Sequence, residues 1–451
     1  MNWRELLASE RFGDKQKNSS QPMRSEFEVD FDRIIFSQPF RRLQDKTQVF
    51  PLPEMDFVHT RLTHSLEVSS VGRSLGKNIA VQIIENNPDL NDITPHDFGA
   101  ITGAASLAHD VGNPPFGHSG EEAISDFFRS NPKGSKIKDE LSDAEWNDLT
   151  KFEGNAQGFR LLIRNHLQGL KITKATLGAF TKYPRPSLVV NEDKARKSQK
   201  KYGYFQSEKE EFSELADTLG LISLSNADNI WCRHPLAFLV EAADDICYNI
   251  IDLEDGFGLG LVSYKDAEGF LANILQDRFM PEKLNGIPGD KEKIGVLRAV
   301  TIQVLVEQVT KIFLENEVDI LSGQFDTALT GKIPAAAALD KISDFSIENI
   351  YRSRQVLEKE AAGFEVISGL LETFLEAVFL KFYSTESYTG KHQSIYRLLP
   401  EYTKFKLEEK EKSAYENVLI VTDFISGLTD SSALSIFRTI KGIAFQGSRR
   451  G

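Results

Sequence analysis

The hydrophobic positions of this chain recur at intervals of three and four residues over most of its length, which is the spacing of amphipathic helices. Clear examples are IGVLRAVTIQVLVEQVTKIF at 294–313 and FEVISGLLETFLEAVFLKFY at 364–383. No segment alternates apolar and polar residues convincingly, although VLVEQV and SLVV are ambiguous. The pattern therefore predicts an all-α protein, with a helical core and additional C-terminal helices.

Polar and proline-containing stretches interrupt this pattern and predict how the chain divides. Residues 1–30 are expected to form an N-terminal arm, because the polar stretch from Gly13 to Gln21 follows only a short helical pattern. Residues 31–265 would form the core that carries the chemistry, with a loop excursion near 184–215. Residues 266–451 would form a C-terminal helical region packed on this core.

Charge and composition exclude several classes of protein. A formal net charge of −13 argues against an extensive nucleic-acid surface, because nonspecific affinity for nucleic acid rests on clustered lysine and arginine. The apolar runs are too short for a membrane span and no signal-peptide pattern opens the chain, so we expect a cytoplasmic protein. Cys232 and Cys247 are too few for a disulfide framework, in agreement with a reducing compartment.

One short stretch, AHDVGNPPFGHSGEE at 108–122, concentrates titratable side chains between two helical patterns. His109 and Asp110 offer an imidazole and a carboxylate, two ligand types that suit first-row divalent metals. An adjacent His-Asp pair is common by chance, so this pair alone is weak evidence for a metal site. The hypothesis depends on further ligands elsewhere in the chain.

Two other helical segments supply such ligands. His64 follows a predicted helix start that Thr60 or Thr63 would cap. The apolar segment 238–252 carries carboxylates on a face that should be buried, which is costly unless they are paired or coordinated. His64, His109, Asp110 and one aspartate of the 244–245 pair therefore form a candidate four-ligand set from three helices.

Asp244 is preferred to Asp245 as the fourth ligand, because Tyr248 and Asp252 follow it at i+4 and i+8 along one helix face. Asp245 stays open as the alternative ligand, or as a residue that orients a ligand histidine. A metal held in this way would keep positions for water and a phosphate oxygen.

A separate acid-base pair follows the His-Asp motif. Gly112 and the Asn-Pro-Pro at 113–115 break the helical pattern, which resumes with His118 and Glu121 three residues apart and hence on one face. A histidine titrates near neutrality, and a nearby carboxylate raises its pKa and fixes its tautomer. His118 is therefore the candidate catalytic residue, with Glu121 as its partner. The alternative is a histidine that caps a helix start.

An anionic ligand would need a local positive site in so acidic a chain. Besides a metal, the candidates are Arg41, Arg42, Arg61, Lys182, Lys194, Arg196, Lys197, Lys200 and Lys201. The last five form a basic run, which a solvated loop explains more simply because blocks of like charge usually lie in exposed segments.

Seven blocks occur in an order that resembles one known family. They are FRRLQDKTQVFPL (40–52), RLTHSLEV (61–68), AHDVGNPPFGHSGEEA (108–123), FEGNAQGFRLL (152–162), KYGYF (201–205), EAADDICYNIIDLED (241–255) and FISGLTD (424–430). Together they resemble the bacterial deoxyguanosine triphosphate triphosphohydrolase-like family of HD-domain enzymes. The resemblance spans most of the chain, from about Arg33 to the C-terminal helix.

The resemblance implies an HD-domain helical core that hydrolyses deoxynucleoside triphosphates, dGTP and others, to deoxynucleoside and inorganic triphosphate. It implies a divalent metal, with Mg, Mn, Co, Ni, Fe and Zn all open. It also implies a homo-oligomer, most often a hexamer, and leaves room for a nucleotide effector at subunit interfaces.

Substrate contacts are also carried over from the resemblance. Gln48 would read the 3′-hydroxyl or the sugar edge, and Tyr248 would pack under the deoxyribose, where an added 2′-hydroxyl would not fit. Arg61 and the Lys182–Tyr183 pair would meet phosphates. The full expected set is Gln48, Arg61, Asn113, Glu153, Lys182, Tyr183, Tyr248 and Asp252. Asn113 stands where some relatives carry a histidine, and no residue indicates a base preference.

Two rival functions share part of this pattern. An HD phosphodiesterase or 5′-nucleotidase has the same kind of metal ligands but lacks the FRRLQDKTQVF and FGHSGEE blocks. A non-catalytic nucleotide sensor would need a lost ligand or a lost His118, and neither is missing from this sequence.

Overall fold

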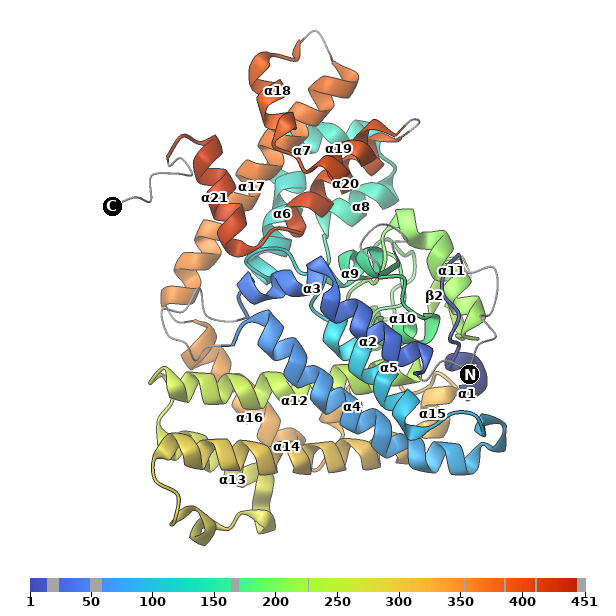
Figure 1. The fold of residues 1–451 in the computed structure, drawn as a ribbon, viewed down its shortest axis with the longest axis vertical. Coiled ribbons are helices and arrows are strands. Elements are labelled where there is room, and N and C mark those ends of the chain that lie inside the picture. Colours follow the sequence, from blue (N-terminus) through green and yellow to red (C-terminus); the bar gives the residue numbers. More distant parts are fainter. Residues whose placement is uncertain are drawn as a thin grey trace.

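The computed structural model describes residues 1–13, 24–48, 59–163, 170–225, 227–352, 354–384, 387–409 and 412–443. Within these ranges the regular secondary structure is helical apart from one two-stranded antiparallel hairpin, β1 (Ser223–Ser225) and β2 (Ile230–Trp231) (Figure 1). The predicted all-α class is therefore confirmed. Most of the predicted polar stretch from Gly13 to Gln21 lies outside the described residues.

The larger of two hydrophobic clusters holds the long helices in the lower part of Figure 1 together. These are α2 (Glu26–Phe36), α4 (Arg61–Asn86), α5 (Pro95–Ala108), α12 (Pro235–Gly258) and α14 (Asp290–Glu315). Gly76 lets α4 and α5 approach closely, since a Cβ there would lie 2.2 Å from Oγ1 of Thr102. Helix α12 is buried on almost every side, and several of its carboxylates are buried with it.

A second hydrophobic cluster lies in the upper part of the molecule (Figure 1). It joins segments that are far apart in the sequence, namely α6 (His118–Ser130), α8 (Asp143–Thr150), α17 (Arg354–Tyr383), α20 (Ala414–Ser426) and α21 (Asp430–Ile440). Helix α17 packs against both α6 and α20. The C-terminal helices are thereby brought against the helix that begins at His118.

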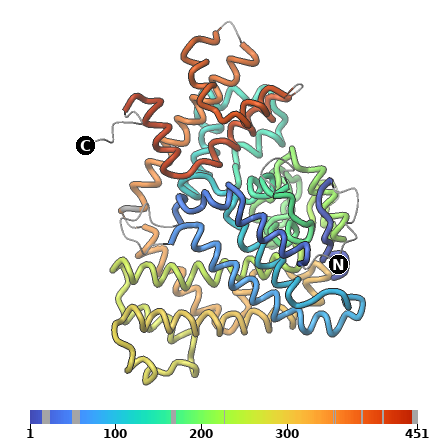
Figure 2. Tube along the Cα trace, viewed as in Figure 1, coloured from blue at the N-terminus to red at the C-terminus, as the bar shows by residue number. Residues whose placement is uncertain are grey.

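The first residues of the chain pack against the larger cluster. Helix α1 (Trp3–Leu6) buries Trp3 and Leu6. It lies beside α15 (Glu317–Leu321) (Figure 2). There Trp3 Nε1 donates to Glu317 at 2.7 Å. The predicted domain boundaries at residues 30 and 265 remain a prediction.

The predicted loop excursion near 184–215 ends earlier than expected. After α10 (Lys174–Phe180) the chain is irregular except for two short 3-10 turns, and α11 (Lys209–Thr218) then begins inside the predicted range. Phe212, Leu215 and Ala216 are the physical reason, because their helical spacing buries one face of α11.

The remaining elements connect these helices. They are α3 (Gln38–Arg42), α7 (Pro132–Ser135), α9 (Gly154–Ile163), α13 (Tyr264–Leu275), α16 (Ala336–Ser346), α18 (Gly390–Arg397) and α19 (Glu401–Glu408), with the short turns η1 (Leu43–Asp45), η2 (Pro88–Leu90), η3 (Lys136–Glu140), η4 (Lys197–Gln199), η5 (Gln206–Glu208), η6 (Gln276–Arg278), η7 (Pro281–Leu284), η8 (Leu329–Gly331) and η9 (Ile347–Tyr351, a π-helix). No single helix in the described part of the chain has the length and apolar character to cross a membrane. Helices α20 and α21 reach that composition only as a pair, bent by 111°.

Candidate active site

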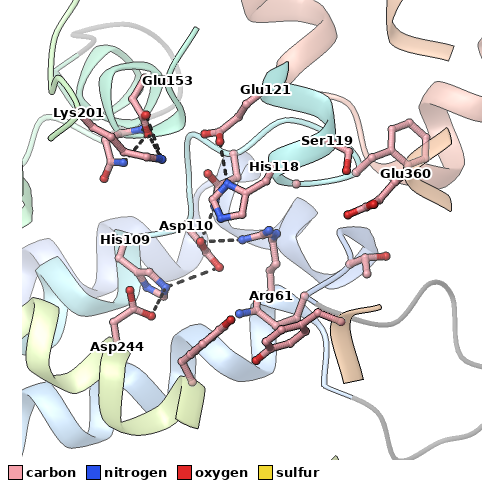
Figure 3. A pocket seen from close by; sticks show the side chains of 18 of the residues that line it. Arg61, His109, Asp110, His118, Ser119, Glu121, Glu153, Lys201, Asp244 and Glu360 are labelled. Carbon is pink, nitrogen blue, oxygen red and sulfur yellow. Dashed lines mark hydrogen bonds and ion pairs between the residues drawn. The ribbon is translucent and has the colours of Figure 1, made fainter. Parts of the chain in front are cut away.

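A cavity of about 550 Å³ opens where the two hydrophobic clusters meet (Figure 3). Its volume lies in the range of small-molecule sites. All the predicted site residues line it except His64 and Asp252, which are buried behind its wall. The chain therefore brings together side chains from the starts of α4 and α6, from α12 and from the N-terminal part of α17.

The predicted metal ligands lie close together at one end of the cavity. Ligand atoms of His64, His109 and Asp244 all fall within 4.8 Å of one another, a spacing that suits a metal ion. The Nε2 atom of His64 lies 3.2 Å from Oδ1 of Asp244, and Nε2 of His109 lies 3.5 Å from the same oxygen. Asp110 adjoins this group, with its Oδ2 atom 3.6 Å from Nε2 of His109.

Two buried atoms in this cluster find no hydrogen-bond partner among the described residues, Nε2 of His109 and Oδ2 of Asp110. His109 donates through Nδ1 to the carbonyl of Ser106 at 2.7 Å, because a carbonyl can only accept. Its Nε2 lone pair therefore faces the cluster, the arrangement usual in metal-binding histidines. Burial lowers the pKa of His109, which keeps the imidazole neutral. These residues fit a divalent metal.

The two carboxylates stay ionised despite their burial. Burial opposes the charge of Asp110, but Arg61, which donates to Oδ1 at 2.8 Å, helps to lower its pKa to about 2. Asn113 donates to the same oxygen. Burial likewise opposes the charge of Asp244, and Lys182 at 2.7 Å holds the pKa of that carboxyl well below its usual range.

Asp245 points away from the cluster. Its Oδ2 atom accepts a hydrogen bond from Thr330 at 2.6 Å, and burial raises its pKa to about 6. Asp244, rather than Asp245, is thus the aspartate that the structure places beside the two histidines. Thr60 caps α4 together with Thr63, as the sequence predicted, and this cap fixes the first turn that carries His64.

His118 and Glu121 form a pair above the Arg61–Asp110 ion pair (Figure 3). His118 Nδ1 lies 2.8 Å from Glu121 Oε2, and the other oxygen of Glu121 accepts from the backbone NH of Gly154 at 2.7 Å. The hydrogen bond and the charge of Glu121 raise the pKa of His118. The imidazole is 84% exposed, so it faces the open cavity.

The residues expected at the sugar are arranged along α12. Tyr248 lines the cavity and stacks on Tyr351 with ring centroids 5.6 Å apart. Asp252 does not line the cavity, because Tyr351 covers it and donates to it at 2.6 Å. Burial raises the pKa of Asp252 to about 7. Gln48 also lines the cavity, and its buried side-chain oxygen finds no partner among the described residues.

The positive residues divide into several groups. Lys182 and Arg61 line the cavity, as does Lys201, whose Nζ lies 3.0 Å from Glu153. Arg196 and Lys197 pair with Asp326 and Glu241, whose side chains are only 6% exposed, whereas Lys194 and Lys200 are exposed. Arg41 and Arg42 line a separate surface pocket. The basic run is thus only partly the solvated loop that its composition favoured.

Several lining residues were not predicted. Tyr351, Val356, Lys359 and Glu360 reach the cavity from η9 and α17. Lys201, which was predicted only as one of the positive residues of the basic run, also lines it. Tyr351, Val356, Lys359 and Glu360 stand in ordinary helical sequence, without a local motif that marks them. Lys201 had a signal, since it begins the KYGYF block.

Comparison with known proteins agrees with this arrangement. The HD domain family matches residues 61–177, and the phosphohydrolase-associated domain family matches residues 329–439. A deoxyguanosinetriphosphate triphosphohydrolase-like protein of Synechocystis is 43% identical over 98% of this chain and all of its own length. The chain belongs to the deoxyguanosinetriphosphate triphosphohydrolase-like family. The resemblance carried by the seven sequence blocks is confirmed.

Other members of the deoxyguanosinetriphosphate triphosphohydrolase-like family match over similar lengths. One from Pseudomonas aeruginosa is 38% identical over 98% of this chain and 99% of its own length. A deoxyguanosinetriphosphate triphosphohydrolase from Enterobacter is 31% identical over 92% of this chain and 94% of its own. Both matched domains contribute to the cavity, since the first includes His109 and His118 and the second includes Tyr351 and Lys359.

Proposed function

We propose that this chain hydrolyses deoxynucleoside triphosphates, dGTP and other dNTPs, to deoxynucleoside and inorganic triphosphate in a metal-dependent reaction. One observation carries the proposal: the His64–His109–Asp244 cluster and the His118–Glu121 pair share a single cavity. Near full-length similarity to proteins named deoxyguanosinetriphosphate triphosphohydrolase supports the choice of substrate.

His64, His109, Asp110 and Asp244 would hold the metal. The unpartnered Nε2 of His109 and Oδ2 of Asp110 are the atoms that most need such an ion, because burying a polar atom without a partner is unfavourable. A bound divalent ion would supply Lewis acidity and positive charge next to a phosphate. Arg61 and Asn113 fix the carboxylate of Asp110 through its other oxygen, so that Oδ2 stays directed at the cluster.

His118 would act as the general acid. Glu121 holds its Nδ1 proton and raises its pKa, so the imidazolium persists near neutral pH and Nε2 is free to donate toward the cavity. The backbone NH of Gly154 fixes the orientation of Glu121 in turn. The proton would go to the 5′-oxygen of the departing deoxynucleoside.

The remaining residues would orient the substrate. Arg61, Lys182, Tyr183 and Lys201 would meet the triphosphate, because they line the cavity near the ligand cluster and three of them carry positive charge. Asn113 and Glu153 would support this end of the site. Tyr248 and Gln48 would hold the sugar, with Tyr248 as a flat wall beside C2′ that disfavours a ribose. Asp252 lies behind Tyr351 and would act on the sugar only through the hydroxyl of that tyrosine.

A product assay tests this function directly. Purified protein with a divalent metal is incubated separately with each dNTP and each NTP, and the products are separated by chromatography. We expect deoxynucleoside and tripolyphosphate from dNTPs, with little turnover of NTPs. A nucleoside mono- or diphosphate as product would instead indicate a different phosphohydrolase, and binding without turnover would indicate a sensor.

Assembly and location complete the proposal. We propose a cytoplasmic homo-oligomer, most simply a hexamer with dihedral symmetry, in which residues 266–451 form a helical region packed on the catalytic core of residues 31–265. Closed symmetric assemblies are the common state of soluble oligomers. A nucleotide effector at a subunit interface would be compatible with this assembly.

A further inference from the structure

Asp430 joins the far C-terminal part of the chain to the candidate active site. It is the first residue of α21 and the last of the FISGLTD block, to which the proposed reaction gives no role. Only 3% of Asp430 is exposed, and it does not itself line the cavity. A carboxylate buried so deeply requires several hydrogen-bond or charge partners.

The partners of Asp430 come from three separate segments. Its Oδ1 atom accepts from the backbone NH of Phe116 at 2.9 Å. Its Oδ2 atom accepts from the backbone NH and the hydroxyl of Thr47 at 3.2 and 2.8 Å, and from Lys359 Nζ at 2.7 Å. Each of these three partner residues lines the cavity.

Each segment also carries a residue that the proposed reaction needs or that faces its substrate. Gln48 directly follows Thr47, and His118 lies two residues beyond Phe116. Lys359 is on α17, whose neighbouring residue Glu360 also lines the cavity. The carboxylate of Asp430 therefore fixes the relative positions of the segment with Gln48, the turn before His118 and the part of α17 that lines the cavity.

The backbone at Phe116 needs such a fixed contact. Phe116 has a φ of +66°, a conformation that bulky side chains rarely adopt, and Gly117 follows with a φ of +60° just before α6. The hydrogen bond from the Phe116 NH to Asp430 helps to offset this strain. The direction in which His118 leaves the turn depends on that conformation.

A second contact from the same C-terminal block acts on the same turn. The buried Nζ of Lys46 donates to the carbonyl of Asn113 at 2.5 Å and to the carbonyl of Ser426 at 2.8 Å. Ser426, like Asp430, belongs to the FISGLTD block. The turn between Asp110 and His118 is thus attached to the end of α20 at one point and to the start of α21 at another.

We propose that Asp430 is a positioning residue of the active site, which holds the Phe116–His118 turn, the Thr47–Gln48 segment and Lys359 in register around one ligand. This inference rests on the proposed function for its kinetic consequence. Asparagine is a poor replacement for the aspartate, because its amide N–H groups would face two backbone NH groups or the Lys359 ammonium, which can only donate.

Asp430→Asn tests the inference, with Asp30→Asn as a matched control. Asp30 is a fully buried aspartate that accepts from Arg11, Thr173 and Thr176, none of which lines the cavity. We expect both variants to lose thermal stability, and only Asp430→Asn to lose turnover. Its kcat should fall by about 10- to 100-fold, the order expected from misplaced reacting groups.

Hydrogen–deuterium exchange gives a readout that is independent of turnover. Peptides containing Phe116 and Thr47 should exchange faster in Asp430→Asn than in the wild type, and should be unchanged in Asp30→Asn. A kcat within about twofold of the wild type, or a loss of kcat without faster exchange at Phe116, would overturn the positioning role.

Thr47→Val keeps the inference testable if Asp430→Asn does not fold. This variant removes one donor to the carboxylate and should cause a smaller change of the same kind, with faster exchange at Phe116 and a lower kcat. Unchanged exchange and unchanged kcat would count against the proposal. If the wild type hydrolyses no dNTP, the proposed function fails, while the exchange measurements still decide whether Asp430 holds the turn.

Discussion

The Nε2 atom of His64 lies 3.2 Å from Oδ1 of Asp244, although 180 residues separate them in the sequence. Helix α4 supplies the histidine and helix α12 the aspartate, and the two helices pack against each other in the larger hydrophobic cluster. His109, at the end of α5, completes the group. The site therefore depends on how three buried helices cross.

Removing one proposed ligand should empty the metal site. We expect purified protein to hold about one divalent ion per chain, and Asp110→Ala to lose both the ion and turnover, because Oδ2 of Asp110 has no other partner in the described structure. Metal analysis by mass spectrometry and the product assay check this. Asp139→Ala, at an exposed aspartate of η3, is the control and should keep both. Full metal occupancy and normal turnover in Asp110→Ala would refute the ligand assignment.

Truncation of His118 should reduce the rate without removing the metal. His118 touches none of the proposed ligands in the hydrogen bonds and ion pairs found among the described residues. His118→Ala should therefore retain metal and nucleotide binding while kcat falls by about 10²–10⁴, the usual contribution of a general acid or base. Glu122→Gln, at an exposed neighbour, should behave as the wild type. A higher KM with unchanged kcat would make His118 a binding residue instead.

The pH dependence of turnover should report the contact between Glu121 and His118. Glu121 raises the pKa of His118, so the protonated imidazole persists to higher pH than an isolated histidine would allow. Activity that requires this proton falls as the pH rises through that raised pKa. In Glu121→Gln the pKa of His118 should drop, and the alkaline limb of the profile should move to lower pH. An unmoved alkaline limb would mean that another group sets it.

His59 should make stability depend on pH on the alkaline side. Burial alone would lower the pKa of His59, but its hydrogen bonds to Asp255 at 2.8 Å and Glu67 at 3.2 Å raise it to about 10. The unfolded pKa is about 6.5. A raised folded pKa means that this stabilisation is complete below about pH 6.5 and is lost as the pH rises through about 10.

Urea unfolding of His59→Gln measures this contribution. The variant should lower the free energy of unfolding by about 1–3 kcal/mol near neutral pH, the range for hydrogen bonds to charged groups. The difference from the wild type should shrink toward about pH 10. His96→Gln, at an exposed histidine of α5, provides the control. A difference that stays constant across the range would show that the charge of His59 does not contribute.

Local sequence patterns predicted the parts of the site that local structure determines. The Thr60 cap places His64, the break at Gly112–Pro115 separates His109 from His118, and i,i+3 spacing pairs His118 with Glu121. Such relationships follow from helix geometry alone. Asp252 shows the limit of this reasoning, because the i+8 spacing puts it on the face of Asp244 but cannot show that Tyr351 covers it.

Residues contributed by tertiary packing could not be predicted in this way. Tyr351 and Lys359 reach the cavity only because η9 and α17 pack beside α12 and α6. Glu241 and Asp326 pair with the basic run from distant helices and turns, so composition alone favoured a solvated loop there. The fold decides which acidic residues pair with the basic run at 194–201. The spacing of residues along the chain does not reveal these partners.

Oligomer formation is the prediction that depends most on the family. Light scattering of the purified protein should show a stable homo-oligomer, with six chains as the expected number. If the oligomer is the active form, it should not dissociate when it is diluted to the assay concentration. A monomer that remains stable and fully active at that concentration would rule out the hexamer.

The bond that breaks can be identified with isotopically labelled water. Tyr248 lines the cavity one helical turn from Asp244, so a sugar against Tyr248 lies beside the proposed ligand cluster. In the proposed reaction, this would put the α-phosphorus, rather than the γ-phosphorus, next to the cluster and on the side of the cavity that His118 faces. Water would then attack the α-phosphorus, the bond to the 5′-oxygen would break, and His118 would give its proton to that oxygen. The proton released by the attacking water would return to His118. Positioning of this kind contributes strongly to rate, because it aligns the reacting atoms before the chemical step.

In water enriched with heavy oxygen, the label should therefore appear in tripolyphosphate and not in the deoxynucleoside. Label in the deoxynucleoside would indicate cleavage between carbon and oxygen. Orthophosphate or pyrophosphate as the first product would place the attack at another phosphorus. Either result would rule out this mechanism.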